Sequence, residues 1–592
     1  MRKNETPVRP AESLDPRWGS DIAAMMLRAL GIKYVAINPG ASYRGLHDSL
    51  VNFLGNQDPR MLLCLHEDHV VSIAHGYAKA TGEPMGAILH SNVGLMHGLM
   101  GIFNAFCDRV PMLILGATGP VEAQKRRPWI DWIHTAKDQG ALLRNYTKWD
   151  DEPRSPEAVI ESFLRGMQAT VSEPKAPVYI CLDAGLQEQT LDRKPRLPDV
   201  SRYTPAPAAS PSPDSIKAVV DLLAEAKNPL LLIGRGSVKR EAWERRVRLA
   251  ELSGASVLTS IRERACFPTD HPLCAATPFF WASARAKEVV RAADAIVSLD
   301  WPDLNGFLQQ ISDHPETVNA RIAHVSLDHQ LHNGWSMDYF GLPPVDIPIA
   351  ASPDALVQQL LPVLERRFEN KPRWKGESRN PERQLAYSAD SSASVAPRDI
   401  EVALAKLRGE RKITLAHVTL GWAGDAYHFG EPLDYLGHDG GAGIGAGPGL
   451  TVGAALALKE SGRTVVSVLG DGDFLQGVTA LWTAAHYGIP ALFIVSNNRS
   501  NFNDEIHQET VAKARNRPVE NRWIGQRIDD PAVDLAAIAR AQGVRAEGPV
   551  SNVTELEEAI LRGLACVAAG ESYLVDVVVK PGYANPPLSR GK

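Results

Sequence analysis

Two apolar runs near the C-terminal end of the chain each stop in side chains that carry oxygen. Residues 465–469 run into Gly470-Asp471-Gly472, and residues 491–495 run into Ser496-Asn497-Asn498. Carboxylate and amide oxygens are the ligands that a hard divalent cation prefers, and glycines let the backbone approach a phosphate. Asp471 and Asn498 are 27 positions apart, a spacing that one strand–helix–strand unit brings to the same edge of a parallel sheet. We therefore predict a site for a divalent cation and a phosphate group at this edge.

A glycine-rich stretch precedes this candidate site. Residues 440–447 are mostly glycine, with Ile444 between Gly443 and Gly445, and they lead into a helix-like stretch at about 450–459. Taken alone, residues 470–472 are equally well explained as a tight strand-to-helix turn, and the asparagines as a cap. The two strands, their spacing and the glycine run together favour a ligand site.

Three further side chains are candidates for acid–base chemistry. Glu67 opens a helix-like stretch after the apolar residues 62–65, where a carboxylate ordinarily complements the helix dipole. His90 ends a strand-like run 23 positions after Glu67, and His134 follows Trp132-Ile133. Histidine titrates near neutral pH and transfers protons in many active sites. For both histidines a purely structural role is the alternative.

Gly470-Asp471-Gly472, then 24 residues, then Asn497-Asn498 resembles the cofactor motif of the thiamine diphosphate-dependent superfamily that includes pyruvate decarboxylase, acetolactate synthase and benzoylformate decarboxylase. The resemblance implies that Asp471, Asn498 and the backbone carbonyl of Ser500 bind Mg²⁺. It also implies cofactor contacts by residues of both glycine-containing motifs, with Ile444 wedging the cofactor into a bent shape and Glu67 protonating its pyrimidine ring. The implied cofactor-binding residues are Gly443, Ile444, Gly445, Gly470, Asp471, Gly472, Asp473 and Asn498.

The histidines favour one reaction within this superfamily. Leu89-His90-Ser91 is similar to the active-site histidine sequence of benzoylformate decarboxylase, and His134 falls where pyruvate decarboxylase-type enzymes carry a His-His-Thr. The resemblance therefore implies C–C bond cleavage or formation next to a carbonyl, and we favour decarboxylation of a 2-oxo acid. An acetolactate synthase-like carboligase is the alternative. A non-catalytic cofactor-binding paralogue is a third reading, which the presence of Glu67 disfavours.

Alternating strand-like and helix-like segments must position these residues. They predict an α/β fold with three doubly wound parallel-sheet domains at residues 15–190, 214–365 and 398–583. Proline-rich and polar stretches separate these domains. By resemblance they are the pyrimidine-binding, central and diphosphate-binding domains. A helix is expected at about 477–487. In the family that the sequence resembles, the segment that matches residues 499–527 covers the active site, so we expect a folded lid there; an inert surface loop is the alternative.

The bulk composition excludes several classes of partner. The 592 residues carry a formal net charge of −6, which gives no reason to expect nucleic acid, and no apolar run reaches membrane-spanning length. The six scattered cysteines are typical of a cytoplasmic protein. Gly234-Arg235-Gly236 lacks the third glycine of a dinucleotide fingerprint, with Lys239 at that offset. The resemblance further implies a homodimer with active sites at the interface, and a homotetramer beyond it.

Overall fold

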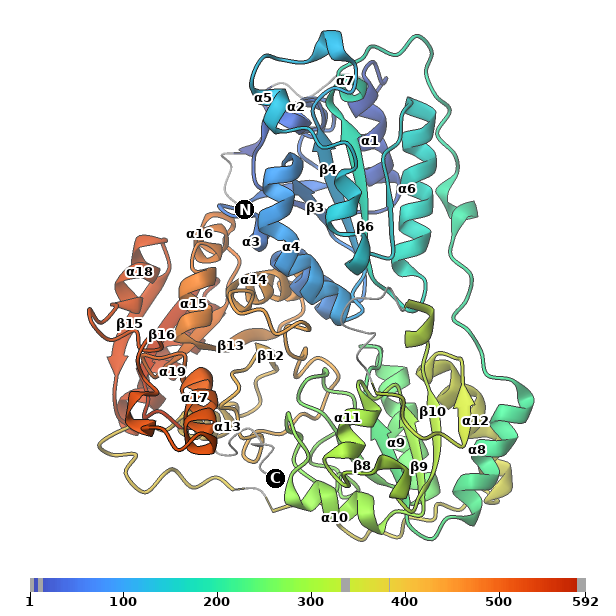
Figure 1. Ribbon diagram of the computed structural model, residues 1–592, viewed down its shortest axis with the longest axis vertical. Helices are drawn as coiled ribbons and strands as arrows, with labels where there is room; N and C mark the ends of the chain where they lie inside the picture. Colours follow the sequence, from blue (N-terminus) through green and yellow to red (C-terminus); the bar gives the residue numbers. More distant parts are fainter. Residues whose placement is uncertain (1–4, 9–13, 332–340, 383, 583–592) are drawn as a thin grey trace.

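The computed structural model describes residues 5–8, 14–331, 341–382 and 384–582. In these residues the chain forms three sheets, each accompanied by its own helices (Figure 1). Neighbouring strands are parallel throughout all three sheets. Strands that alternate with helices along the chain produce this arrangement. The predicted fold class, three parallel-sheet α/β domains, is confirmed.

The first sheet has the strand order β2-β1-β3-β4-β6-β5. Its strands are β1 (Tyr34–Ile37), β2 (Arg60–Leu63), β3 (Gly86–Leu89), β4 (Met112–Thr118), β5 (Trp149–Asp151) and β6 (Pro177–Asp183). Its helices are α1 (Gly19–Ala29), α2 (Arg44–Asp48), α3 (Glu67–Thr81), α4 (Ser91–Cys107), α5 (Ile130–Ile133), α6 (Pro156–Val171) and α7 (Ala184–Gln187). Because the strand order reverses between β1 and β3, their carboxyl ends flank the crevice in which open α/β sheets bind ligands.

The central sheet has the order β11-β10-β9-β7-β8. Its strands are β7 (Pro229–Ile233), β8 (Ser256–Thr259), β9 (Ala295–Leu299), β10 (Arg321–Val325) and β11 (Ile347–Ile349). Its helices are α8 (Pro213–Glu225), α9 (Arg240–Ser253), α10 (Ala284–Ala292), α11 (Leu304–Gln309) and α12 (Pro353–Arg367). Arg235, in the turn after β7, pairs with Asp328 at 2.8 Å and with Asp300 at 3.4 Å. The chain's own ion pairs therefore engage the turn that carries the incomplete glycine fingerprint.

The third sheet has the order β12-β13-β14-β16-β15. Its strands are β12 (Ile413–His417), β13 (Thr464–Gly470), β14 (Leu492–Asn497), β15 (Arg545–Val550) and β16 (Tyr573–Val578). Its helices are α13 (Pro397–Leu407), α14 (Gly447–Leu458), α15 (Asp471–Gly477), α16 (Ala480–Tyr487), α17 (Phe502–Ala514), α18 (Leu535–Ala541) and α19 (Val553–Ala568). The helix expected at 477–487 thus begins earlier, at Asp471, and is split into α15 and α16.

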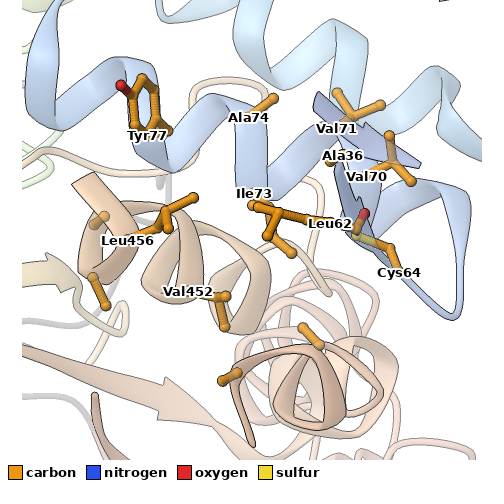
Figure 2. Packing of buried hydrophobic residues seen from close by; sticks show 14 of the residues in the cluster. Ala36, Leu62, Cys64, Val70, Val71, Ile73, Ala74, Tyr77, Val452 and Leu456 are labelled. Carbon is orange, nitrogen blue, oxygen red and sulfur yellow. The ribbon is translucent and has the colours of Figure 1, made fainter. Parts of the chain in front are cut away.

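Helices α3 and α14 join the first domain to the third. Ile73 and Ala74 on α3 belong to the same buried hydrophobic cluster as Val452 and Leu456 on α14 (Figure 2). Glycine allows the close approach, because a Cβ added at Gly453 would lie 1.9 Å from the carbonyl oxygen of Ile73. One continuous core therefore runs between the domain that carries Glu67 and the domain that carries Asp471.

Candidate active site

Asp471 and Asn498 meet at the carboxyl ends of two paired strands. Gly470 on β13 is in register with Ser496 on β14, so the residues after each strand lie side by side. The backbone N–H of Ser500 donates to Asp471 Oδ2 at 3.1 Å and also to Asn498 Oδ1 at 3.0 Å. Both side-chain oxygens therefore accept from the same backbone N–H and lie on the same side of the sheet edge.

The chemistry of this corner fits a hard divalent cation. A carboxylate and an amide oxygen are the donor types that Mg²⁺ and Ca²⁺ take. Burial raises the pKa of Asp471 to about 6, which is the cost of keeping the carboxylate charged without a counter-ion. A divalent cation would remove that cost.

Further hydrogen bonds hold the residues around Asp471 and Asn498 in place. The Asn497 side chain donates to Asp576 on β16 at 2.9 Å, and the Ser500 hydroxyl donates to Glu505 on α17 at 2.6 Å. Ser500 also pairs with Arg527 in an antiparallel bridge. The segment expected as a lid thus forms a helix and a turn that are anchored beside Asp471 and Asn498.

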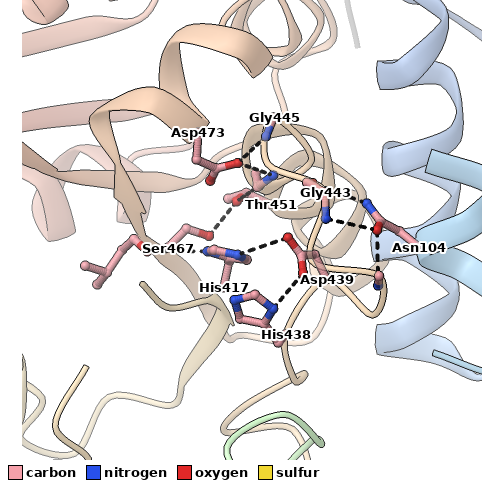
Figure 3. Close-up of polar contacts among 12 residues, drawn as sticks. Asn104, His417, His438, Asp439, Gly443, Gly445, Thr451, Ser467 and Asp473 are labelled. Atoms are coloured by element: carbon pink, nitrogen blue, oxygen red, sulfur yellow. Dashed lines mark hydrogen bonds and ion pairs between the residues drawn. The ribbon is translucent and has the colours of Figure 1, made fainter. Parts of the chain in front are cut away.

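The glycine run is fastened at both ends. Asp473, in the first turn of α15, accepts hydrogen bonds from the backbone N–H groups of Gly445 at 2.6 Å and Gly447 at 3.3 Å. On the other side Asn104 of α4 accepts from Gly441 at 3.1 Å and Gly443 at 3.4 Å (Figure 3). The Asp473 carboxylate therefore shapes the loop.

Ile444 projects from the middle of this tightly held loop. Its side chain is 52 % exposed, although Gly445 and Ala446, which follow it, are buried. Gly445 has a φ of +102°, a backbone conformation that essentially only glycine adopts without strain. A large apolar side chain presented by a rigid glycine turn is a surface ready to receive an apolar ring.

Glu67 is the first residue of α3 and is 9 % exposed. Its Oε2 lies 3.0 Å from Nδ1 of His97 on α4, and the ring of His97 stacks on His66 at 5.2 Å between ring centroids. Sequence reasoning missed His97. The signal was available, since His90, Gly94 and His97 follow the spacing of one helix face.

His90 lies where the strand order of the first sheet reverses. Ser42 Oγ and His90 Nδ1 are 2.8 Å apart, and a Cβ added at Gly40 would lie 2.1 Å from the His90 ring. The ring of His134 stands edge-on to that of His90, with 4.7 Å between centroids. Burial, followed by the charge of His134, lowers the pKa of His90 to about 4 despite an opposing effect of Glu67.

The predicted site residues therefore fall into two groups linked by the glycine run. Glu67, His90 and His134 come from the first domain, while Asp471, Asn498 and Ser500 come from the third. Burial, together with the charge of Asp473, raises the pKa of Asp68 to about 6. The start of α3 therefore faces the start of α15 within one chain.

The central domain has an aromatic cavity of its own. A cavity of about 720 Å³ is lined by residues that include Phe279, Phe280, Trp281 and Trp301. The edge of Phe280 meets the His438 ring of the third domain at 5.2 Å. The aromatic residues after β8 thus line a cavity next to the third domain, in addition to packing in the core.

Comparisons with known proteins identify the class to which this fold and site belong. Models of the N-terminal, central and C-terminal domains of thiamine pyrophosphate enzymes match residues 17–142, 216–360 and 418–577. The chain belongs to the thiamine pyrophosphate enzyme family, and thiamine diphosphate is its cofactor. In the described part of the chain, the helices lack the length and apolar character needed to cross a bilayer.

Its relatives include enzymes of more than one reaction type. The chain is 25 % identical to a probable acetolactate synthase large subunit of Methanocaldococcus jannaschii, over 97 % of this chain and 94 % of the relative. It is 26 % identical to a benzoylformate decarboxylase of Pseudomonas aeruginosa, over 91 % and 95 %. The solved structure of a benzoylformate decarboxylase from Polynucleobacter necessarius has a TM-score of 0.79 at 21 % identity and covers 97 % of this chain and 100 % of its own.

Proposed function

We propose that this protein is a Mg²⁺- and thiamine diphosphate-dependent enzyme that removes CO₂ from a 2-oxo acid. The observation that carries the proposal is the convergence of Asp471 and Asn498 on the Ser500 amide, at 3.1 and 3.0 Å, beside a glycine run held in a fixed shape. Relatives named as a decarboxylase and as an acetolactate synthase both support this chemistry.

The third domain would hold the cofactor and its metal. Asp471, Asn498 and the backbone carbonyl of Ser500 would bind Mg²⁺, which in turn neutralises the diphosphate. Residues Gly470 and Gly472 leave room for the diphosphate, and the Gly443-Ile444-Gly445 turn supports the rings. Asp473 acts on the cofactor indirectly, because its carboxylate holds the amides of Gly445 and Gly447.

Glu67 would govern the reactivity of the site. When bound, thiamine diphosphate supplies the electron sink for breaking a C–C bond next to a carbonyl. Glu67 is almost fully buried, so its carboxyl can hold a proton at the pyrimidine ring without competition from water. The hydrogen bond from His97 Nδ1 fixes which carboxylate oxygen remains available.

His90 would handle the substrate side, with Ser42 and His134 as its neighbours. An imidazole whose pKa is lowered to about 4 is neutral near pH 7, so it acts there as a hydrogen-bond partner or base. The carboligase alternative is supported by the probable acetolactate synthase among the relatives; in that reaction a second carbonyl compound reacts in place of a proton. The decarboxylase and carboligase reactions share the loss of CO₂ and differ in the step that follows it.

A product panel distinguishes the two outcomes. Purified protein with Mg²⁺ and thiamine diphosphate is incubated with aliphatic and aromatic 2-oxo acids. We expect CO₂ and the corresponding aldehyde. Acyloin in place of free aldehyde would assign the carboligase reaction instead, and the absence of CO₂ from every acid would contradict both.

We also propose that the active form is a homodimer, and beyond it a homotetramer, with each active site at a subunit interface. The support is the division of the site between two domains, since Glu67 belongs to one and Asp471 to the other. The side chains of Ile444 and His97 are both exposed, and a second copy of the chain would cover them.

A further inference from the structure

Three buried groups with metal-ligand chemistry converge in the third domain away from the Asp471 corner. His417 ends β12, and His438 and Asp439 immediately precede the glycine run. One ligand atom from each lies within 4.8 Å of the other two. The two imidazoles lie next to each other, with 5.0 Å between ring centroids, and both approach the Asp439 carboxylate (Figure 3).

The hydrogen-bond pattern of His417 leaves a lone pair pointing at a carboxylate. His417 Nδ1 faces the carbonyl oxygen of Val468 at 3.5 Å, which places the ring proton on Nδ1. Nε2 is then an acceptor, yet it lies 4.0 Å from Asp439 Oδ2, another acceptor. Two buried acceptors that face each other repel unless a cation lies between them.

His438 lies against the Asp439 carboxylate. Its Nδ1 is 2.6 Å from Asp439 Oδ1, while the Lys79 ammonium is paired with Asp108 and with the His438 carbonyl. The backbone N–H of His438 donates to the Arg262 carbonyl at 3.0 Å. These contacts hold the His438 backbone in place, and its side chain is 13 % exposed, which leaves a route for an ion.

We propose that His417, His438 and Asp439 bind a borderline divalent cation such as Zn²⁺, at a site separate from the oxygen-only Mg²⁺ corner. Two imidazoles and one carboxylate are a donor set that suits Zn²⁺, Fe²⁺ or Co²⁺ in preference to Mg²⁺. A ligating histidine whose other nitrogen donates to a backbone carbonyl is the usual outer arrangement. Donors about 2.0–2.2 Å from a tetrahedral ion lie roughly 3.4 Å apart. The 4.0 Å gap between His417 and Asp439 would therefore close on binding, and the 2.6 Å contact between His438 and Asp439 would open.

A cation at this site would connect the end of β12 to the start of the glycine run. His417 belongs to the strand next to β13, and Asp439 is bonded directly to Gly440 at the start of the glycine run. A cation here would fix the residues just before the run, in addition to the hydrogen bonds by which Asn104 and Asp473 hold the run itself.

The test uses Co²⁺ as the probe, added to full-length protein already saturated with Mg²⁺ and thiamine diphosphate. We expect one equivalent to bind per chain, with the strong visible absorption of nitrogen-ligated Co²⁺, and Zn²⁺ to displace it. His417→Gln and Asp439→Asn should abolish that absorption. His97→Gln should leave it unchanged, because that histidine belongs to the separate cluster with His66 and Glu67.

Binding by wild type that His417→Gln does not reduce would overturn the proposal, as would the absence of Co²⁺ binding; a proton or water would then occupy the gap. X-ray absorption of Zn²⁺-loaded wild type gives a reading that does not depend on any variant folding. Two imidazole nitrogens in the first shell support the site, and a shell of oxygens alone contradicts it.

Discussion

At the scale of single residues, the environment of Glu67 differs from that of an ordinary helix-start carboxylate. It is almost fully buried, and the neighbouring α4 presents His97 to it at 3.0 Å. Gly94 makes this approach possible, because a Cβ there would lie 3.1 Å from Glu67 Oε1. A carboxylate held in this way is pre-organised to hold a proton at one defined oxygen.

Replacing Glu67 tests this role. We expect Glu67→Gln to lower kcat by about 10²–10⁴-fold, the usual contribution of a positioned acid–base group, while Mg²⁺ and thiamine diphosphate still bind. Steady-state kinetics and cofactor titration measure the two quantities. Glu161→Gln, whose side chain in the same domain is 70 % exposed, serves as the control. Full activity of Glu67→Gln would refute the cofactor assignment.

His90 predicts a pH-dependent stability. Its pKa of about 4, lowered first by burial and then by His134, lies below the value near 6.5 of an unfolded chain. Between pH 6.5 and pH 4, His90 is protonated in the unfolded state but neutral in the folded state. Acidification through this range therefore destabilises the fold. Above pH 6.5 this effect is absent.

Urea denaturation of wild type and His90→Gln at pH 7.5 and pH 5 measures the effect. We expect the variant to lose less stability than wild type on acidification, by about 1 kcal/mol after allowance for partial solvent screening. Equal losses in the two proteins would show that the His90 ring titrates normally.

At the scale of elements, the contact of α3 with α14 positions the two halves of the site. Gly76 approaches the Leu450 carbonyl, and Gly453 approaches that of Ile73, so that an added Cβ would lie 2.1 or 1.9 Å from these oxygens. Backbone atoms cannot move aside as a flexible side chain can. Any residue larger than glycine must therefore push the helices apart.

We expect Gly453→Ala to destabilise the protein by about 1–3 kcal/mol, the usual cost of overpacking, and to weaken cofactor binding. Thermal unfolding and thiamine diphosphate titration report the two effects. Gly430→Ala is the matched control, since its Cβ would meet only Asp434 at 3.9 Å. If Gly453→Ala matched the control in both measurements, the helix contact would not position the site.

At the scale of the whole molecule, the two halves of one active site can come from the same chain or from two chains of a dimer. Glu67 and Asp471 occupy domains that share a core within one chain, yet the proposed dimer would pair each with the partner's complementary half. Mixed dimers separate these arrangements, because closed twofold symmetry places two equivalent sites in each dimer.

Co-expression of Glu67→Gln with Asp471→Asn is the measurement. With sites at the interface, a mixed dimer contains one site with both native residues, so activity should return to about a quarter of the wild-type value at random pairing. Each variant expressed alone is the control and should be inactive. With sites inside one chain, every site would lack one residue and the mixture would stay inactive.

Much of the fold and part of the site could be predicted without coordinates. The strands ending at Gly470 and Asn497 and the helix opening at Glu67 were foreseen, because apolar runs and helical periodicity are local signals. The helix after Gly470 was placed six residues late. Asp471 and Asp473 lie in the first turn of α15 and stabilise the start of that helix. The helix has only seven residues, which is too short for a helical periodicity to be recognised in the sequence.

Strand ends and loop spacing are local features, so the sequence is sufficient to predict the fold class and the meeting of Asp471 with Asn498 at one sheet edge, and the cofactor follows from the family resemblance of the same motif. The contacts of Ser42 with His90, of His97 with Glu67, of Asp473 with the glycine run and of His417 with Asp439 are visible only in the folded chain. These contacts join different elements, and their distances depend on how helices and sheets pack, which no local spacing records.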